Sequence, residues 1–556
     1  MRNALRIYEQ LSDMSLSSRA VGLAAAGFLS LAAAPAAAQA TDCAALAGTT
    51  LAGAHIISAV PVAAGGLEGA ASVIAPDLAQ RVASMPAFCR VKATATPTPD
   101  SRIGIEVWLP LQKWNGRLLG TGNGGGAGQI AYEMGMIEGL KRGFAVANTD
   151  MGTAPDINTT VGHPERWVDF GHRATHETTR VAKTMVSAYY KVASFRSYFA
   201  GCSTGGQQAL SAAQRYPSDY DGILAGDTGN NRTHSASYFL WNYATLNASP
   251  LAKLSAGQWS MVSRAVLASC AGKDGGAPGD KFLTDPRRCG FDPATLPVCR
   301  TGTSADTCVT APQVATLRRL YAGPTNPRTG ERIYAGLTPG SEDQPLGPVM
   351  QGDPKTWPDQ QFYPFRWTLG SAFEASRFDF DSDLDRVDAQ LASTLNANDA
   401  DLSDFARHGG KLLLYTGLAD PAVPFAEVVN YYERVGASAG GSDQDFARLF
   451  LVPGMGHCFG GPGVTDIGQP FTSAVPPAQE NDALMSLVAW TEGGKPPAML
   501  IARKPAGDGQ PAKERPICAY PALPEYRRGD VLKRSSFACV PHARGVDQRP
   551  AGRYLN

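Results

Sequence analysis

The chain has 556 residues, and its 50 lysines and arginines balance 50 aspartates and glutamates, so its formal net charge is zero. This balance excludes the strongly basic surface that nucleic-acid binding needs. Hydrophobic residues make up 44% and charged residues 18%, which excludes a disordered chain and predicts a globular protein. Length alone would allow three or four domains of about 150 residues each, or a single α/β unit with a long insertion.

The first forty residues have the pattern of a secretory signal peptide. Arginines precede an apolar run over 20–34, and small residues over 35–40 offer a cleavage site. The alternative is a buried or membrane-anchoring helix, but the run is short for a span, which needs about twenty residues. We expect residues 1–40 to be removed. The mature protein would then have no membrane span and would be secreted or periplasmic, where thiols oxidise.

Strand and helix patterns alternate through the first part of the mature chain. Short apolar or alternating runs predict strands, and longer amphipathic runs predict helices. The predicted strands are 103–109, one beginning at 117–120, 144–148, 197–200 and 221–226, and the predicted helices are 174–190 and 207–215. This alternation is typical of a parallel sheet covered by helices on both faces.

The alternation stops near Gly226 and resumes near Lys411. The residues between are rich in Gly, Pro, Trp and Cys and have no strand-helix-strand rhythm, so we interpret 227–410 as one inserted lid domain. The core would consist of 41–226 and 411–556. Its remaining elements are predicted as strands at 411–415 and 448–452 and a helix at 481–492.

The string Gly201-x-Ser203-x-Gly205 fits a nucleophile elbow, a strand-to-helix turn so tight that glycine is needed beside the serine. A glycine-rich turn without chemistry is the alternative. Here an apolar strand precedes the string and a helix follows it, as an elbow requires. We therefore predict Ser203 as a nucleophile.

A serine nucleophile needs a histidine base and a carboxylate, which in this fold follow in the order Ser, Asp or Glu, His. Of the eight histidines, His457 lies just past the strand at 448–452, where a base projects from the carboxyl edge of the sheet. Asp420 follows the strand at 411–415 in the same way. Either residue alone could be an ordinary loop residue. Their order and their positions at strand ends together favour a triad with Ser203.

Ten cysteines in an oxidising compartment indicate five disulfides. Cys202 precedes the predicted nucleophile, and Cys458 follows the predicted base. If they pair, their Cα atoms lie within roughly 4.4–6.8 Å and Ser203 and His457 are close in space. The four cysteines of the insertion lack C-x-x-C spacing, which favours two local disulfides over a zinc site: Cys270, Cys289, Cys299 and Cys308.

These motifs resemble the tannase and feruloyl esterase family, which includes hydrolases of mono-(2-hydroxyethyl) terephthalate. The family's Cys-Ser, Asp, His-Cys arrangement occurs here as Cys202-Ser203, Asp420 and His457-Cys458, with further similarity at 122–125, 167–176 and 285–289. The resemblance covers about residues 43–539. It implies an α/β-hydrolase core with a large inserted lid domain and no cofactor for catalysis. Ser203 would form the acyl-enzyme, His457 would act as general base and acid, and Asp420 would orient the histidine.

Sequence order and the resemblance also imply the remaining cysteine pairs: Cys43 with Cys89, Cys270 with Cys289, Cys299 with Cys308 and Cys518 with Cys539. Family members often hold calcium in the loop between the second of these pairs, and its ligands would come here from Asp274, Gly276, Asp280 and Phe282. However, Ala271 replaces the first expected Asp and two residues are inserted before Asp280. A calcium site and a solvated glycine-rich turn both stay open.

Acyl transfer also needs hydrogen-bond donors aimed at the oxyanion. The backbone N–H of Thr204, at the start of the elbow helix, is one candidate. The second should come from the glycine-rich stretch 122–126, where we favour Gly124 or Gly125. A phosphate-binding loop is the rival interpretation, but the stretch lacks the Lys-Ser/Thr of a P-loop.

An aromatic cluster in the insertion could line a pocket over Ser203 and stack on an aromatic acyl group. Its candidate substrate-binding residues are Trp357, Phe365 and Arg366. The alternative is that these residues build the core of the lid itself.

Together these features predict a serine carboxylesterase that acts on a small-molecule aromatic ester. Feruloyl and related hydroxycinnamoyl esters come first, and galloyl esters (a tannase-type activity) or terephthaloyl monoesters come next; the identity of the acid rests on the resemblance. The alternatives are a lipase or peptidase of the same fold and a non-catalytic protein that binds phenolics or carbohydrate. The oligomeric state stays open.

Overall fold

The computed structural model describes residues 42–67, 75, 77–300, 305–355, 361–470, 472, 481–507 and 509–555. These residues belong to one compact unit, Ala40–Asn556. The predicted signal peptide 1–40 and the predicted pocket residue Trp357 lie outside the described residues. No helix in the described part of the chain is both long and apolar enough to cross a membrane.

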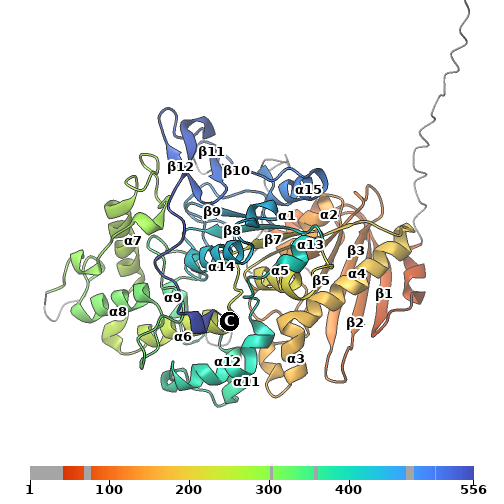
Figure 1. Cartoon of the computed structure of the whole chain (residues 1–556), viewed down its shortest axis with the longest axis horizontal. Helices are drawn as coiled ribbons and strands as arrows, with labels where there is room; N and C mark the ends of the chain where they lie inside the picture. Colours follow the sequence, from red (N-terminus) through yellow and green to blue (C-terminus); the bar gives the residue numbers. More distant parts are fainter. Residues whose placement is uncertain are drawn as a thin grey trace, which may run out of the picture. The chain divides into compact units, whose positions relative to one another are not determined.

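A nine-stranded sheet forms the centre of this unit, in the order β1-β2-β3-β5-β4-β6-β7-β8-β9 (Figure 1). Strands β5, β4, β6, β7, β8 and β9 run parallel to one another, which confirms the predicted parallel sheet for this part. The bounds are β1 Ala54–Val62, β2 Phe88–Ala95, β3 Ile103–Pro110, β4 Arg117–Thr121, β5 Ala145–Thr149, β6 Arg196–Cys202, β7 Gly222–Gly226, β8 Lys411–Gly417 and β9 Ala447–Val452.

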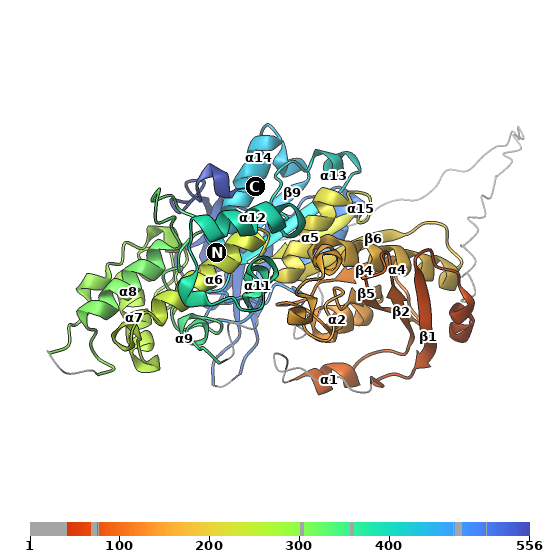
Figure 2. The same cartoon turned by 90° about the horizontal axis from the view of Figure 1, so that it is seen from below.

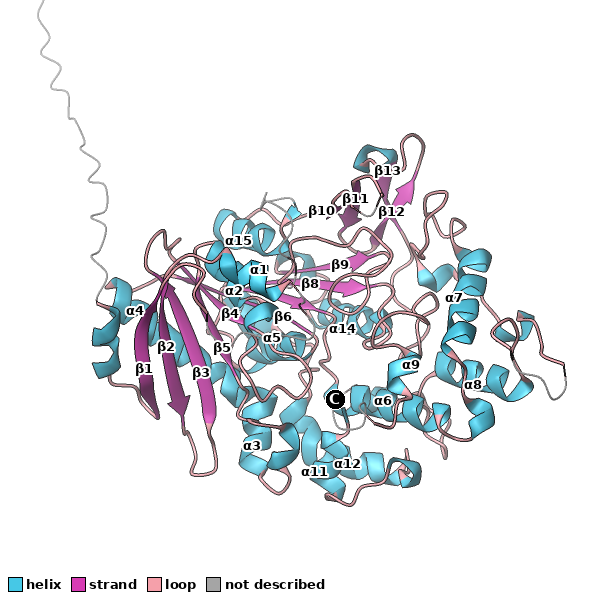
Figure 3. Cartoon of the chain, turned by 180° about the vertical axis from the view of Figure 1, so that it is seen from behind, coloured by secondary structure: helices cyan, strands magenta, loops and turns pink. Residues whose placement is uncertain are grey.

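The parallel arrangement does not extend to one edge of the sheet, where the strands 54–62 and 88–95 were not predicted. Strands β1, β2, β3 and β5 pair antiparallel, and β1, β2 and β3 lie side by side at that edge (Figure 3). For β2 and β3 the length of the connection gives the reason. Only residues 96–102 join these two strands, whereas a parallel crossover needs a dozen or more.

Helices cover both faces of the sheet, as predicted. Strand β8 shows why, because Leu412 and Leu414 pack into one core cluster while Leu413 and Tyr415 pack into another. Side chains of a strand alternate between its two faces, so both faces of β8 are apolar and need cover. One face carries α4 (Ala174–Tyr190), α5 (Thr204–Arg215) and α14 (Phe425–Ser438), and the other carries α2 (Met136–Lys141) and α15 (Ala483–Gly493).

The chain between the neighbouring strands β7 and β8 contributes no strand to the main sheet among its described residues. This is the segment 227–410 that the sequence predicts as an insertion. Its α7 and α8 lie at the opposite end of the unit from β1 (Figures 1 and 2). Its α6 and α12 instead share a core cluster with α4, and the division into two domains stays a prediction. The helices are α6 Arg232–Leu246, α7 Ala256–Cys270, α8 Ala311–Ala322, α9 Pro348–Gln351, α11 Tyr363–Leu369, α12 Ser382–Leu395 and α13 Ser403–Arg407.

Further elements were not predicted from the sequence. After α15, two small antiparallel sheets form, β10 with β11 and β12 with β13. Their strands are β10 Met499–Lys504, β11 Lys513–Cys518, β12 Ala522–Tyr526 and β13 Phe537–Pro541, and two short helices lie earlier, α1 Leu78–Ala83 and α3 Pro164–Val168.

All five expected disulfides are present. Their Cα–Cα distances run from 5.0 to 5.8 Å, within the usual range. The pairs are Cys43–Cys89, Cys202–Cys458, Cys270–Cys289, Cys299–Cys308 and Cys518–Cys539. The cysteines of the insertion are therefore paired with each other.

Candidate active site

Ser203 lies between the end of β6 and the first residue of α5, with φ 62° and ψ −120°. This backbone conformation is rare and strained for a residue with a side chain. A Cβ at Gly205 would lie 2.9 Å from the Cα of Gly122, and a Cβ at Gly201 would collide with Gly205. Glycine is therefore required on both sides of the turn. The turn leaves Ser203 partly exposed between the buried Cys202 and Thr204, as expected of an elbow.

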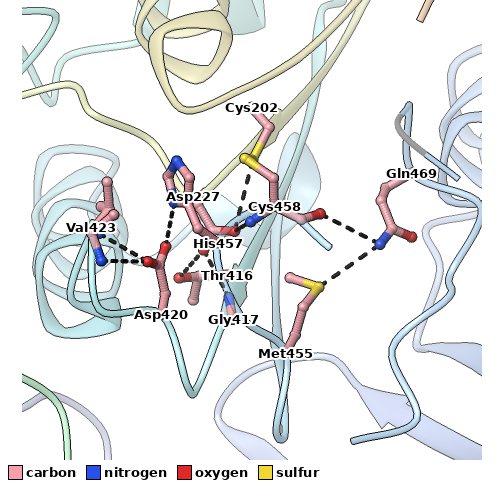
Figure 4. Close-up of a disulfide and its surroundings, with 11 residues drawn as sticks. Cys202, Asp227, Thr416, Gly417, Asp420, Val423, Met455, His457, Cys458 and Gln469 are labelled. Carbon is pink, nitrogen blue, oxygen red and sulfur yellow. Dashed lines mark hydrogen bonds and ion pairs between the residues drawn. A yellow bond between two sulfur atoms is a disulfide. The ribbon is translucent and has the colours of Figure 1, made fainter. Parts of the chain in front are cut away.

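The other two residues of the predicted triad are hydrogen-bonded to each other (Figure 4). Asp420 is fully buried in the loop after β8, and His457 follows β9. One carboxylate oxygen of Asp420 accepts the N–H groups of Ala422 and Val423, and the other lies 2.7 Å from Nδ1 of His457. Because a carboxylate can only accept, Nδ1 carries the proton and Nε2 of the neutral ring is left as a base.

The disulfide between Cys202 and Cys458 connects the two halves of the site. Its Cα atoms are 5.8 Å apart although 256 positions separate the cysteines in the chain. Neighbouring Cα atoms are about 3.8 Å apart, so the Cα atoms of Ser203 and His457 lie no more than about 13 Å from each other. The disulfide thus limits the distance between the serine and the Asp420–His457 pair, and a triad of the three residues stays a prediction.

The structure adds a residue that the sequence analysis missed, Asp227. It is fully buried directly after β7. One of its carboxylate oxygens accepts from the hydroxyl of Thr416 at 2.9 Å and the N–H of Gly417 at 2.8 Å, and the other accepts the N–H of Cys458 at 2.7 Å. Asp227 therefore connects the end of β8 with the loop that carries His457 (Figure 4).

Asp227 also lies close to the charged groups of the site and interacts with them electrostatically. One side-chain atom each of Asp227, Asp420 and His457 lies within 4.8 Å of the others. Burial and the charge of Asp420 raise the pKa of Asp227 to about 7, against the lowering effect of His457 and the two N–H donors. Its position after a strand at the carboxyl edge of the sheet was the signal that could have identified it, but the predicted lid begins at residue 227.

The pKa of His457 lies above its ordinary value. Burial acts to lower this pKa, but the charge and hydrogen bond of Asp420, together with the charge of Asp227, outweigh burial. Arg232 acts in the opposite direction. The two carboxylates therefore stabilise the imidazolium form, which a histidine reaches when it accepts a proton from a serine.

The predicted oxyanion donors lie against the elbow. The carbonyl of Gly125 accepts the hydroxyl of Thr204 at 2.7 Å, and the carbonyl of Asn123 accepts the N–H of Gly205 at 2.8 Å. Thr204 is the first residue of α5, so its N–H has no partner within the helix. Among the described residues, the N–H groups of Gly124 and Gly125 also have no acceptor. These are the donors that the oxyanion prediction named, and their role stays a prediction.

The two predicted pocket residues of the insertion that the structure describes, Phe365 and Arg366, have different surroundings. Phe365 is fully buried and packs against the rings of Phe373 and Phe378, which also belong to the insertion. Nη1 of Arg366 donates to the side chain of Asn158 at 2.6 Å. For Phe365 the packing matches the alternative interpretation, in which these residues build the lid's own core.

The residues of the expected calcium loop do not fit a calcium ion. The carboxylate of Asp274 accepts backbone N–H groups from Gly276, Thr284 and Asp285. Asp280 accepts the N–H of Ala277 and pairs with the guanidinium of Arg515 at 3.2 Å. The side chain of Phe282 packs against Gly454. Since protein donors and a guanidinium occupy both carboxylates, we assign no metal here.

Comparison with known proteins agrees with this geometry. The family model described as "Tannase and feruloyl esterase" matches residues 89–540. An uncharacterized esterase of Xanthomonas campestris pv. campestris is 39% identical over 552 residues, covering 92% of this chain and 93% of that protein. A protein of Aspergillus flavus named "Probable feruloyl esterase B-1" is 31% identical over 467 residues, covering 81% of this chain and 86% of that protein.

A solved structure has the same fold. The crystal structure of feruloyl esterase B from Aspergillus oryzae superimposes with a TM-score of 0.79 at 26% identity, covering 88% of this chain and 98% of that one. The α/β-hydrolase core predicted from the sequence is therefore confirmed.

Proposed function

We propose that this chain hydrolyses esters of aromatic acids through an acyl-enzyme on Ser203. The premise is that the chain belongs to the tannase and feruloyl esterase family and is a carboxylic ester hydrolase. Feruloyl and related hydroxycinnamoyl esters are the first candidate substrates. Galloyl esters and terephthaloyl monoesters come next.

In the proposed reaction, Nε2 of His457 takes the proton of Ser203 as the serine oxygen attacks the ester carbonyl. The N–H groups of Thr204 and of Gly124 or Gly125 stabilise the oxyanion of the tetrahedral intermediate. His457 then protonates the leaving alcohol, and a water activated by the same histidine releases the acid. Asp420 holds the ring and stabilises its charged form.

The observation that carries this proposal is the 2.7 Å hydrogen bond between Asp420 and His457 beside the disulfide to Cys202. It supports a base with the correct tautomer next to a serine in an elbow. A protein that only bound its ligand would not need a strained serine beside a charged pair.

A small panel of esters tests the proposal. Release of acid from methyl ferulate, methyl gallate, mono-(2-hydroxyethyl) terephthalate and a triglyceride is measured with the wild type, Ser203→Ala and Ser211→Ala. Ser211 lies in α5, the helix that follows Ser203, and among the described residues its buried hydroxyl has no hydrogen-bond partner, so Ser211→Ala is the matched control. Activity on an aromatic ester should vanish only in Ser203→Ala. A wild-type rate in Ser203→Ala would refute the mechanism, and turnover of the triglyceride alone would refute the substrate class.

We also propose that the protein is exported to the periplasm or the medium. Its five disulfides support an oxidising compartment. Cell fractionation followed by N-terminal sequencing should find a mature chain that begins near residue 41. A reduced, full-length chain in the cytoplasmic fraction would contradict export.

A further inference from the structure

Arg232, the first residue of α6, carries a buried charge without a carboxylate partner among the described residues. Three arginines among the described residues are only 5% exposed. Arg81 pairs with Glu138 and Arg515 pairs with Asp280, whereas Arg232 has no ion pair within the described chain. Arginine is almost never buried this deeply unless it is paired, so the missing anion needs an explanation.

The contacts of Arg232 within the protein are neutral. Nε donates to the hydroxyl of Tyr363 at 2.5 Å, and Nη2 donates to the carbonyl of Gly125 at 3.2 Å. The guanidinium also lies over the rings of Phe170 and Tyr363, 5.9 and 5.5 Å from their centroids. These contacts hold the group in place, but they do not neutralise its charge. A guanidinium has five N–H donors, and only the two named here are used within the described residues.

This charge lies beside the proposed nucleophile. A Cβ built on Gly229 would lie 3.3 Å from Nη1 of Arg232 and 3.7 Å from the carbonyl oxygen of Ser203. Gly125, whose carbonyl accepts from Nη2, belongs to the stretch expected to bind the oxyanion. The effect of Arg232 on the pKa of His457 agrees with this placement. The free N–H groups are therefore within the reach of a bound ester.

We infer that Arg232 binds a carboxylate group of the substrate, so that the enzyme prefers aromatic esters that carry a free carboxylate in addition to the ester bond. This inference rests on the proposed esterase function and narrows its substrate class. The carboxylate can belong to the acyl part or to the alcohol part of the ester. Both would offer the guanidinium the same charge-assisted hydrogen bonds.

Two pairs of matched esters distinguish these sources. Methyl 4-carboxybenzoate and methyl 4-carbamoylbenzoate differ in a carboxylate against a carboxamide on the acyl side. Carboxymethyl benzoate and carbamoylmethyl benzoate differ in the same way on the alcohol side. For each pair, kcat/KM of the charged ester is divided by kcat/KM of the neutral ester. This ratio is then divided by the ratio of the rates at which hydroxide hydrolyses the same two esters. The wild type should favour the charged member of one pair by about 10- to 100-fold, the range that a charge-assisted hydrogen bond supplies.

Arg232→Gln should reduce that ratio to near 1, and Arg232→Lys should restore part of it. A wild-type ratio near 1 in both pairs would overturn the inference without any variant. So would a high ratio that persists in Arg232→Gln, since the charge would then come from elsewhere. Circular dichroism of both variants checks their folding.

Binding without turnover separates this inference from the proposed function. Calorimetry measures the affinity of Ser203→Ala, with and without Arg232→Gln, for the charged and neutral members of the preferred pair. The charged ester should bind Ser203→Ala at least about 10-fold more tightly, and Arg232→Gln should abolish the difference. Equal affinities would refute the role of Arg232, whereas residual hydrolysis by Ser203→Ala would refute the catalytic role of Ser203.

Discussion

Removal of the disulfide between Cys202 and Cys458 tests whether this bond positions the catalytic groups. We compare the Cys202→Ala, Cys458→Ala double variant with Cys270→Ala, Cys289→Ala, which removes a disulfide within the insertion. Both bonds stabilise the folded protein, but only the first connects the loop of His457 to the elbow of Ser203. The expected results therefore differ in activity as well as in stability.

The separations in the chain set the expected losses of stability. The first bond closes a loop of 256 positions and the second a loop of 19. On the chain-entropy model, their loss lowers the free energy of unfolding by about 5 and about 3 kcal/mol, respectively. Urea unfolding of both variants and the wild type, monitored by fluorescence, gives these values.

Activity is compared in buffer without urea, at a temperature at which both variants remain folded. The first variant should lose about 10- to 100-fold in kcat/KM for methyl ferulate, since small displacements of catalytic groups have effects of this size. The control variant should stay near the wild-type rate. A fully active first variant would refute the positioning role of the bond. An equal loss of activity in both variants would reduce its role to general stability.

Three further predictions follow from the site and its surroundings. Asp227→Asn removes a negative charge that raises the pKa of His457. Since the base must be neutral to act, the acid limb of the pH profile of kcat/KM should move to lower pH. An acid limb that stays in place or moves to higher pH would contradict this. Chelation with EDTA or addition of calcium should shift the melting temperature by less than about 1 °C, because Asp274 and Asp280 are occupied by protein donors, and a clear rise with calcium would restore the metal site. Gly201→Ala should lower the melting temperature and the activity together, because its Cβ would collide with Gly205, whereas Gly48→Ala, which meets nothing within 4 Å, should change neither.

The sequence alone was enough to predict most of the core. Strands such as 411–415 and 448–452 are short apolar runs because both of their faces are covered. This composition depends little on which strands are their neighbours in the sheet.

The direction of the strands at the edge of the sheet could not be predicted in this way. Whether β1, β2 and β3 join it parallel or antiparallel depends on the length of their connections and on pairing across the sheet.

The proposed triad was grouped from the sequence for a related reason. Ser203, Asp420 and His457 each follow a strand, and the carboxyl ends of parallel strands meet at one edge, so their order in the chain was sufficient to group them. The positions of Cys202 and Cys458 beside two of them added a distance restraint.

What only the tertiary structure decided is which charges have partners. Asp227 and Arg232 are ordinary residues in the sequence, at the start of a region without regular rhythm. Their importance comes from burial and from neighbours such as Cys458 and Tyr363, which lie far along the chain. The same holds for Asp280, whose partner Arg515 occupies a carboxylate that the sequence offers to a calcium ion. Electrostatic energy depends on distance and on exposure to water, and folding sets both between residues that the sequence keeps hundreds of positions apart.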